Sequence, residues 1–480
     1  MDPKRKSQFG QFFTPASIAR FMAEMFDVGG KEDCRLLDPG AGIGSLSAAF
    51  LDRWVSGGLN FRRIELHAFE IDKALLPYLN KTLAAYEDQA GLVPLIRNVD
   101  FVHAAADSLF GNLFAAALPG YTHAILNPPY KKIRSDSAHR AALRKVGIET
   151  VNLYSAFVAL SLSLLDDQGE LVAIIPRSFC NGPYYRPFRN FMLEQAVIKQ
   201  IHLFSSRNKA FKDDDVLQEN IIIRLERGGR QGPIRISTST DESFDDLTVQ
   251  EYPLERIIFP DDPERFIRVP TSFEINAIES SPAIRYSLND LNIRVSTGPV
   301  VDFRVKEHLR QMPEAGTVPL LYPGHFSSKG TEWPKPAMKK PNAIRRNSET
   351  EKWLYPNGCY CVVRRFSSKE ERRRVVANIV DPSKFGGSPL IGFENHLNVF
   401  HQDKKGLPKA VAAGLAVFLN TTAVDENFRA FNGHTQVNAT DLNRMRYPSR
   451  ETLIAVGEWA LGRSELSQET IDEKLEGMAA

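Results

Sequence analysis

The fold is decided by residues 35–46, which read Arg35-Leu36-Leu37-Asp38-Pro39-Gly40-Ala41-Gly42-Ile43-Gly44-Ser45-Leu46. The apolar start predicts a buried strand, the glycines predict a turn, and the residues after them open a helix. Glycines let a backbone come close to a ligand, because they lack a side chain and accept unusual φ values. This order predicts a nucleotide-binding unit of an open α/β sheet, and a dinucleotide-binding enzyme shares the pattern.

Acidic residues at three successive strand ends disfavour a dinucleotide. Asp38 stands just before the first glycine, where a carboxylate would repel a pyrophosphate but could hold an ammonium group or a bound water. The next strand is followed by Glu70, whose carboxylate can accept hydrogen bonds from both hydroxyls of a ribose. A third strand, expected to end at Val99-Asp100-Phe101, offers a carboxylate and a ring to an adenine base. The pattern therefore favours a nucleoside ligand.

A second motif, Asn127-Pro128-Pro129-Tyr130, follows an apolar run that predicts a short buried strand. Ligands bind at the ends of such strands in an open α/β sheet. The prolines fix φ and remove two donors, so the loop is stiff and its carbonyls are left to accept hydrogen bonds. Two acceptors beside a flat aromatic face suit an exocyclic amino group on a flat ring. A plain turn after a strand is the alternative, since Asn and Pro are common in turns.

With its motifs in this order, the chain resembles the gamma-class, S-adenosylmethionine-dependent DNA adenine-N6 methyltransferases of the type II restriction-modification kind. That family has an N-terminal cofactor segment, a glycine loop, a catalytic tetrapeptide and a C-terminal target recognition domain. Residues 10–15 resemble the N-terminal segment. The resemblance implies that S-adenosylmethionine is bound by Phe12, Thr14, Asp38, Gly40, Gly42, Glu70, Asp100 and Phe101. Asp107 is the alternative to Asp100, because the spacing to the tetrapeptide is wide.

The resemblance also assigns the catalytic role to Asn127, Pro128, Pro129 and Tyr130. The Asn127 side chain and the Pro128 carbonyl would accept hydrogen bonds from the target amino group, which is positioning and electrostatics rather than base catalysis. The target adenine must be flipped out of the duplex. Tyr130 and Phe211 would then stack on it.

Bulk properties indicate a soluble globular protein of two domains. The chain has 480 residues, 43% hydrophobic and 25% charged. It shows no membrane-spanning run and no export signal, so we expect a cytoplasmic protein, associated with the nucleoid in a prokaryote, without membrane contact. Its four cysteines form no metal-ligand pattern. We therefore expect reduced thiols and no metal. We also expect the protein to be a monomer.

Double-stranded DNA as a partner requires local clusters of basic residues, because the net charge is only +2. One cluster spans residues 339–346 and includes Arg345. A denser one spans residues 364–374 and contributes Arg364, Arg365 and Arg372. Interleaved aromatic and serine residues favour contacts with phosphates and bases, whereas a solvated charged surface is the alternative.

The expected fold class is α/β, a doubly wound Rossmann-like methyltransferase sheet followed by a mixed α+β target recognition domain. We place the catalytic domain at residues 1–284 and the recognition domain at residues 285–480. In the second domain, residues 318–322 predict a strand, and Pro319 indicates an edge strand or the start of a strand.

Other functions share parts of this pattern. RNA adenine-N6 and protein-amide methyltransferases carry the same tetrapeptide, but they usually lack a C-terminal domain of this size. Cytosine-N4 enzymes more often have Ser in place of Asn127, and cytosine-C5 chemistry needs a cysteine nucleophile that the catalytic loop lacks. A non-catalytic DNA-binding specificity protein is the alternative of another class. Because the catalytic domain starts almost at residue 1, we expect any cognate restriction endonuclease to act as a separate protein.

Overall fold

The structure is a computed structural model that describes residues 14–28, 32–112, 116–204, 219–260, 262–270, 278, 281–327, 330–367, 371–432, 436–463 and 465–479. The chain divides into two compact units, residues 1–270 and 271–480. The boundary expected at residue 284 falls inside the second unit, because β10 (Ile284–Tyr286) pairs with β22 (Tyr447–Pro448) near the C-terminus. No helix in the described part of the chain is long and apolar enough to cross a membrane.

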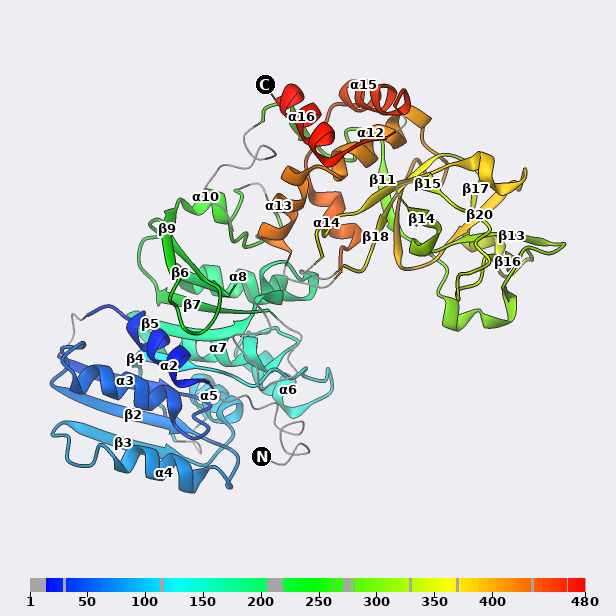
Figure 1. Ribbon diagram of the computed structural model, residues 1–480. Coiled ribbons are helices and arrows are strands. Elements are labelled where there is room, and N and C mark those ends of the chain that lie inside the picture. Colours follow the sequence, from blue (N-terminus) through cyan, green and yellow to red (C-terminus); the bar gives the residue numbers. More distant parts are fainter. Residues whose placement is uncertain are drawn as a thin grey trace. The chain divides into compact units, whose positions relative to one another are not determined.

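A nine-stranded sheet forms the centre of the first unit (Figure 1). Its strands are β1 (Asp33–Asp38), β2 (Arg63–Phe69), β3 (Leu92–Arg97), β4 (Tyr121–Leu126), β5 (Leu165–Pro176), β6 (Ala196–Phe204), β7 (Asn220–Arg227), β8 (Ile234–Ser239) and β9 (Thr248–Tyr252). The spatial order is β3-β2-β1-β4-β5-β7-β6-β8-β9. β1 to β5 are parallel, and β7 runs antiparallel between β5 and β6. The doubly wound sheet is thus confirmed, and the inserted β7 distinguishes it from the dinucleotide-binding order.

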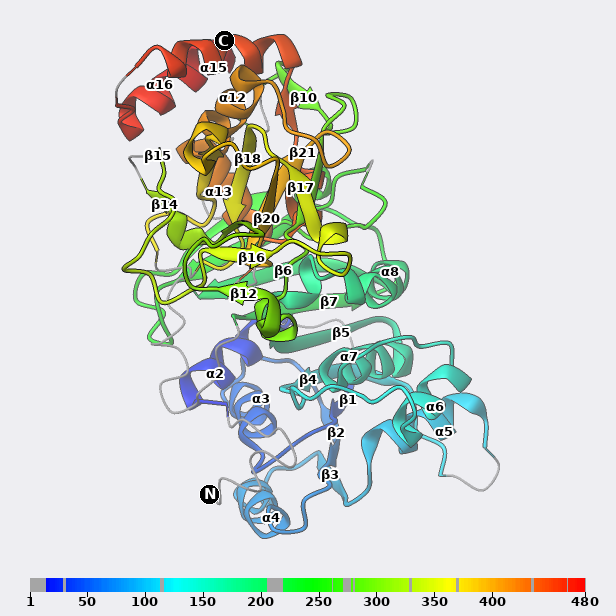
Figure 2. The same ribbon diagram turned by 90° about the vertical axis from the view of Figure 1, so that its right-hand side faces the viewer.

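Helices cover both faces of this sheet (Figure 2). They are α2 (Ala16–Glu24), α3 (Ser45–Val55), α4 (Leu76–Ala84), α5 (Phe101–Phe110), α6 (Ala138–Lys145), α7 (Leu153–Leu164), α8 (Arg186–Gln195) and the short α10 (Leu254–Ile257). Alternate residues of a strand point to opposite faces. Leu36 accordingly joins the core beneath α2, α3 and α4, whereas Leu37 joins the core beneath α5, α7 and α8.

The third strand ends earlier than the sequence predicted. β3 stops at Arg97, and Asp100 is the N-cap residue of α5 instead of the end of a strand. Its side chain accepts a hydrogen bond from the His103 N–H at 3.2 Å, which satisfies one of the donors that a helix start leaves unpaired. The cap holds the Asp100 carboxylate at the carboxyl edge of the sheet, where a carboxylate was expected to meet an adenine base.

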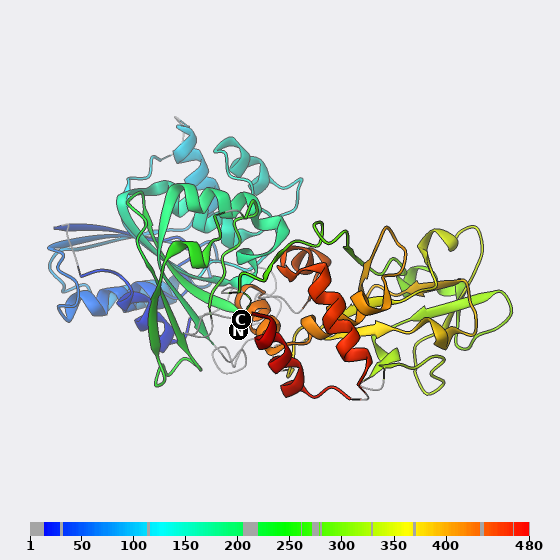
Figure 3. The same cartoon turned by 90° about the horizontal axis from the view of Figure 1, so that it is seen from above.

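The second unit combines small sheets with C-terminal helices. Its strands are β10 and β22 as given above, β11 (Arg294–Thr297), β12 (Leu309–Arg310), β13 (Thr317–Leu321), β14 (Phe326–Ser327), β15 (Gly330–Thr331), β16 (Ala343–Arg345), β17 (Leu354–Pro356), β18 (Tyr360–Arg364), β19 (Ala377–Val380), β20 (Leu390–Phe393) and β21 (Leu397–His401). Its helices are α12 (Lys409–Leu419), α13 (Thr422–Phe431), α14 (Ala439–Arg444), α15 (Arg450–Leu461) and α16 (Gln468–Ala479). α12 packs on β18 and β19, with α15 beside it (Figure 3, orange and red).

The prediction that Pro319 marks an edge strand or a strand start is wrong, because Pro319 is the third residue of β13. β13 lies between β16 and β20 in a five-stranded sheet. It pairs with β16 through residues 317–319 and with β20 through residues 320–321. Because pairing with β20 begins only after Pro319, the missing N–H of the proline interrupts no ladder.

Candidate active site

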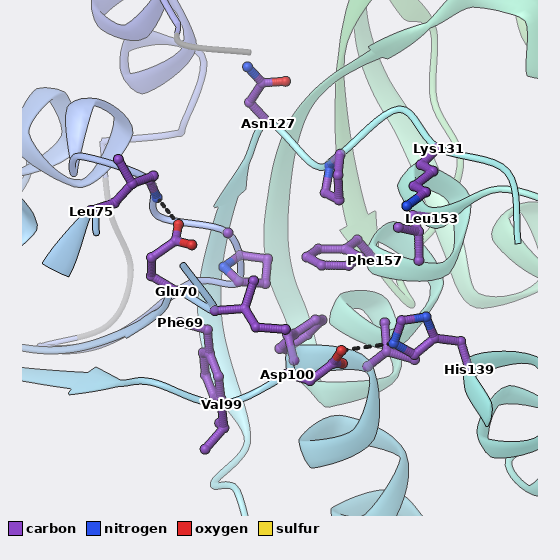
Figure 4. Close-up of a pocket in the computed structure, with 17 residues that line it drawn as sticks. Phe69, Glu70, Leu75, Val99, Asp100, Asn127, Lys131, His139, Leu153 and Phe157 are labelled. Carbon is purple, nitrogen blue, oxygen red and sulfur yellow. Dashed lines mark hydrogen bonds and ion pairs between the residues drawn. The ribbon is translucent and has the colours of Figure 1, made fainter. Parts of the chain in front are cut away.

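A cavity of about 340 Å³ opens at the carboxyl ends of the parallel strands (Figure 4). Its walls come from the segments that follow β1, β2, β3 and β4, namely residues 39–42, 69–71, 99–102 and 127–131, and from α6 and α7. This is the crevice in which open α/β sheets bind ligands, and the volume is that of a small-molecule site.

The glycine loop and Glu70 form one wall. Gly42 has φ of 58°, in the region that favours glycine. Its N–H donates to Glu70 Oε2 at 2.8 Å, and the Asp72 N–H donates to Glu70 Oε1 at 2.6 Å. Glu70 therefore ties the loop after β1 to the loop after β2. Burial raises the pKa of the Glu70 carboxyl.

Asp38 lies buried under the same loop. Its Oδ2 accepts a hydrogen bond from Ser47 Oγ at 2.6 Å. Its Oδ1 is buried and makes no hydrogen bond of good geometry among the described residues, although the backbone N–H groups of Gly40 and Ser47 lie near enough to the carboxyl to favour its charged form. Burial raises the pKa of this carboxyl to about 7. A buried acceptor left without a donor is costly, so the site is suited to a ligand donor or a bound water.

Asp100 and His139 close another end of the cavity. His139 Nε2 lies 2.8 Å from Asp100 Oδ2, and both residues line the wall (Figure 4). Burial is the largest single influence on Asp100 and opposes its ionisation, but the hydrogen bond and charge of His139, together with His103, outweigh it and lower the pKa of the carboxyl. The same bond raises the pKa of His139. Asp100, His103 and His139 each offer one atom that could bind a metal ion, and these three atoms lie within 4.8 Å of one another.

The tetrapeptide follows β4, and its side chains are held in place. Asn127 Nδ2 donates to Thr14 Oγ1 at 3.0 Å, so Thr14 holds the side chain of Asn127 from the nitrogen end of its amide. Asn127 Oδ1 lies 3.2 Å from the Tyr130 hydroxyl, which also lies 3.1 Å from the carbonyl oxygen of Ile174 on β5. The Asn127 amide oxygen accepts from Tyr130 and, with two lone pairs, can accept a second hydrogen bond. Asn127 and Pro129 line the cavity.

The structure brings most of the predicted cofactor residues together. Gly40, Gly42, Glu70, Asp100 and Phe101 line the cavity, with Asp38 beneath and Thr14 bonded to Asn127. Asp107, the alternative to Asp100, does not line it. Phe12 and Phe211 lie outside the described residues.

Sequence reasoning missed the wall opposite the glycine loop. Leu153 and Phe157 from α7 supply apolar surface there, and His139 comes from α6. Lys131, the residue directly after the tetrapeptide, also lines the cavity. No residue pattern marked His139, because its partner lies 39 positions away in the sequence.

The basic residues of the second unit differ in their surroundings. Arg345 is exposed and lies 3.8 Å from Glu314, and Arg372 is exposed. Arg364 pairs with Glu371. Arg365 Nη2 donates to Gln436 Oε1 at 3.2 Å. Arg374, within the denser cluster, is fully buried and bonded to Ser367 and Asn432, so its role is structural.

The cysteines do not support the cysteine nucleophile that cytosine-C5 methylation would need. Burial raises the pKa of the Cys180 thiol to about 12, so this thiol stays protonated and is a poor nucleophile at neutral pH. All four cysteines are free.

Known proteins resemble the chain over different lengths. Residues 96–211 match the family described as Eco57I restriction-modification methylase. The type II methyltransferase M.BsuBI of Bacillus subtilis is 56% identical over 476 residues, covering 98% of this chain and 94% of that protein. M.PstI of Providencia stuartii, also a type II methyltransferase, is 41% identical over 482 residues, covering 98% and 93%. The cryo-EM structure of a DrdV–DNA complex has a TM-score of 0.51 at 13% identity, covering 95% of this chain and 57% of that one, and it supports the fold alone.

Proposed function

The chain belongs to the type II DNA methyltransferases, and from that premise we propose that it transfers a methyl group from S-adenosylmethionine to N6 of an adenine flipped out of double-stranded DNA. The observation that carries the proposal is the Asn127 amide. Its nitrogen donates to Thr14, and its oxygen, beside the Tyr130 hydroxyl, has a lone pair for one more hydrogen bond. An exocyclic amino group is the matching donor.

The cavity fits the cofactor. Asp38 Oδ1, buried and without a partner among the described residues, would accept a hydrogen bond from the cofactor's ammonium group or from a water between them. Glu70 would accept from the ribose hydroxyls, and Asp100 from the adenine amino group. Phe101 and Phe157 provide apolar surface for the base. S-adenosylmethionine would supply a methyl group already activated by the positive charge on its sulfur.

The chain's own residues address the other difficulty, which is the weak nucleophilicity of the target nitrogen. Its lone pair is delocalised into the adenine ring. Asn127 Oδ1 and the Pro128 carbonyl accept hydrogen bonds from the two amino hydrogens, which favours a pyramidal nitrogen with an available lone pair. This is electrostatic positioning by a stiff loop. Tyr130 stacks on the flipped base, at about 1–3 kcal/mol for such a contact.

Tyr130 is well placed for that role because its ring is anchored. Its hydroxyl bonds to the β5 backbone at Ile174, and its ring meets Tyr154 edge-on at 6.2 Å. Burial raises the pKa of the phenol far above its usual value, so it remains a neutral donor. A rigid ring loses little conformational freedom when a base stacks on it.

The second unit reads the sequence around the target. The exposed Arg345 and Arg372 suit phosphate contacts, which position a protein without specifying a sequence. One chain carries the catalytic motifs, the cavity and the basic second unit, which supports action as a monomer. A cognate restriction endonuclease, where one exists, is a separate protein. DNA as the substrate would place the enzyme at the nucleoid.

The direct test uses purified enzyme with methyl-labelled S-adenosylmethionine and, in parallel, unmodified double-stranded DNA, RNA and protein extract. Nucleoside analysis by mass spectrometry should find N6-methyladenine in the DNA alone. Asn127→Ala is the matched control and should give no product. Label in RNA or in protein amides would replace the proposal with one of its rivals, and N4-methylcytosine would show that the target base is wrong.

A further inference from the structure

We propose that His396 reads a base of the DNA recognition sequence, an inference that rests on the proposed function of the second unit. Glu394, Asn395 and His396 form the turn that joins β20 to β21. The His396 side chain is 42% exposed, whereas Glu394 is completely buried. The turn therefore exposes the imidazole of His396 to a binding partner, while the buried Glu394 holds the turn in place.

The imidazole is held in one orientation. His396 Nδ1 lies 2.6 Å from Glu394 Oε1, and the His396 backbone N–H donates to Glu394 Oε2 at 2.9 Å. Both carboxylate oxygens thus hold the same residue. With Nδ1 engaged, Nε2 is the atom left to recognise a ligand, and no described residue bonds to it.

The turn itself is stiff. Its Asn395 N–H donates to the Val300 carbonyl at 2.9 Å. Arg365 reinforces it from the other side, because its N–H donates to the His396 carbonyl at 2.8 Å and its Nη1 to the Asn395 carbonyl at 3.3 Å. These contacts make Arg365 a support for the turn, and its expected contact with DNA stays a prediction. A side chain that specifies a base needs such a rigid mount.

An aromatic face lies next to the imidazole. The Phe366 ring is 39% exposed, and its centroid lies 4.8 Å from that of His396. Apolar rings beside a polar reader suit base edges and thymine methyl groups.

The surrounding charges favour a base over a phosphate. Glu394 lies directly behind the ring, and Asp302 is close enough to His396 for their charges to interact. Two cations close to the turn are already engaged, because Arg365 is bonded within it and Lys340 pairs with Asp302 at 2.7 Å. A base edge needs only one hydrogen-bonding atom, which Nε2 supplies, whereas a phosphate is held best by cations that are free to turn to it.

The test compares wild-type enzyme with His396→Ala and His396→Gln on the mapped recognition duplex and on every single-base-pair variant of it. We expect discrimination at one base pair, measured as a ratio of kcat/KM values, to fall roughly 10- to 100-fold, with discrimination at the other positions retained. His308→Asn is the matched control. It alters another histidine of the second unit that bonds to a glutamate, Glu349 at 3.0 Å, and specificity should not change.

Three results would overturn the inference. Unchanged discrimination in both His396 variants, with unfolding curves like that of the wild type, would make the pair with Glu394 purely structural. Weaker binding to all sequences, with a salt slope lower by about 1, would make His396 a phosphate contact. A wild-type enzyme that methylates no DNA would remove the proposed function, and the inference with it. Phe366→Leu gives an independent check. Removing the Phe366 ring should loosen the His396 imidazole and reduce discrimination at the same base pair.

Discussion

Asp38→Asn should stabilise the cofactor-free protein, by an amount that grows with pH. Burial raises the pKa of Asp38 from 3.8 to about 7. Between these two values the folded chain holds a proton that the unfolded chain releases, so wild-type stability falls as the pH rises through this window. The difference of about 3 pKa units corresponds to an upper bound of about 4 kcal/mol above pH 7.

The substitution removes this cost because asparagine carries no charge. Its advantage over wild type should be near zero at about pH 4 and should grow by about 3 kcal/mol between about pH 5 and pH 8. The Ser47 hydroxyl can still donate to the asparagine oxygen, so the packing is kept. Urea titrations across this pH range measure the effect, with hydrogen exchange of β1 as the reporter for the first unit.

Asp107→Asn, which changes a carboxyl that does not line the cavity, is the matched control in the same titrations. If the Asp38→Asn advantage is flat across pH, the carboxyl is not held in a costly environment. Its unpaired oxygen would then say nothing about a ligand. The variant should also bind S-adenosylmethionine more weakly, because it lacks the carboxylate that would accept a hydrogen bond from the cofactor. The buried carboxylate thus lowers the stability of the cofactor-free protein but strengthens cofactor binding.

Other predictions concern the division of labour. Asn127→Ala should abolish methyl transfer while calorimetry finds nearly unchanged cofactor affinity; full activity would sink the mechanism. Glu70→Ala should weaken the cofactor by roughly 1.5–3 kcal/mol without altering the methylated sequence, and an unchanged affinity would remove Glu70 from the ribose role. His139→Ala should weaken the cofactor by about 1 kcal/mol, and His139→Gln, which keeps a donor for Asp100, should restore part of it. Exchanging residues 271–480 for those of a relative should transfer the recognition sequence; an active chimera that keeps the original site would place specificity in the first unit.

The sequence was most informative where one segment supplies both a fold signal and a chemical group. The glycine loop and the tetrapeptide each follow an apolar strand, so their place at the carboxyl edge could be predicted, and the family prediction is confirmed by the relatives. The Asp100 carboxylate was predicted at the cavity, although as the end of a strand. A helix cap and a strand end can place the same side chain at the same edge.

The sequence was least informative where a role depends on distant partners. Nothing near His139 in the sequence indicates its bond to Asp100. In the basic cluster, Arg374 looks like its neighbours, yet it is buried and neutralises no phosphate. Arg365 is similar, because its contacts with residues 395 and 436 come from other segments of the chain. Charge counts cannot separate structural arginines from exposed ones, since burial is a property of the folded unit.

The most direct test of the central claim is to sequence modified bases in DNA from cells that express the wild-type chain or Asn127→Ala. The account predicts N6-methyladenine at one adenine of a single recognition sequence with the wild-type chain, and none with the variant. Modified cytosine, an unmodified genome, or methylation that persists in Asn127→Ala would contradict it.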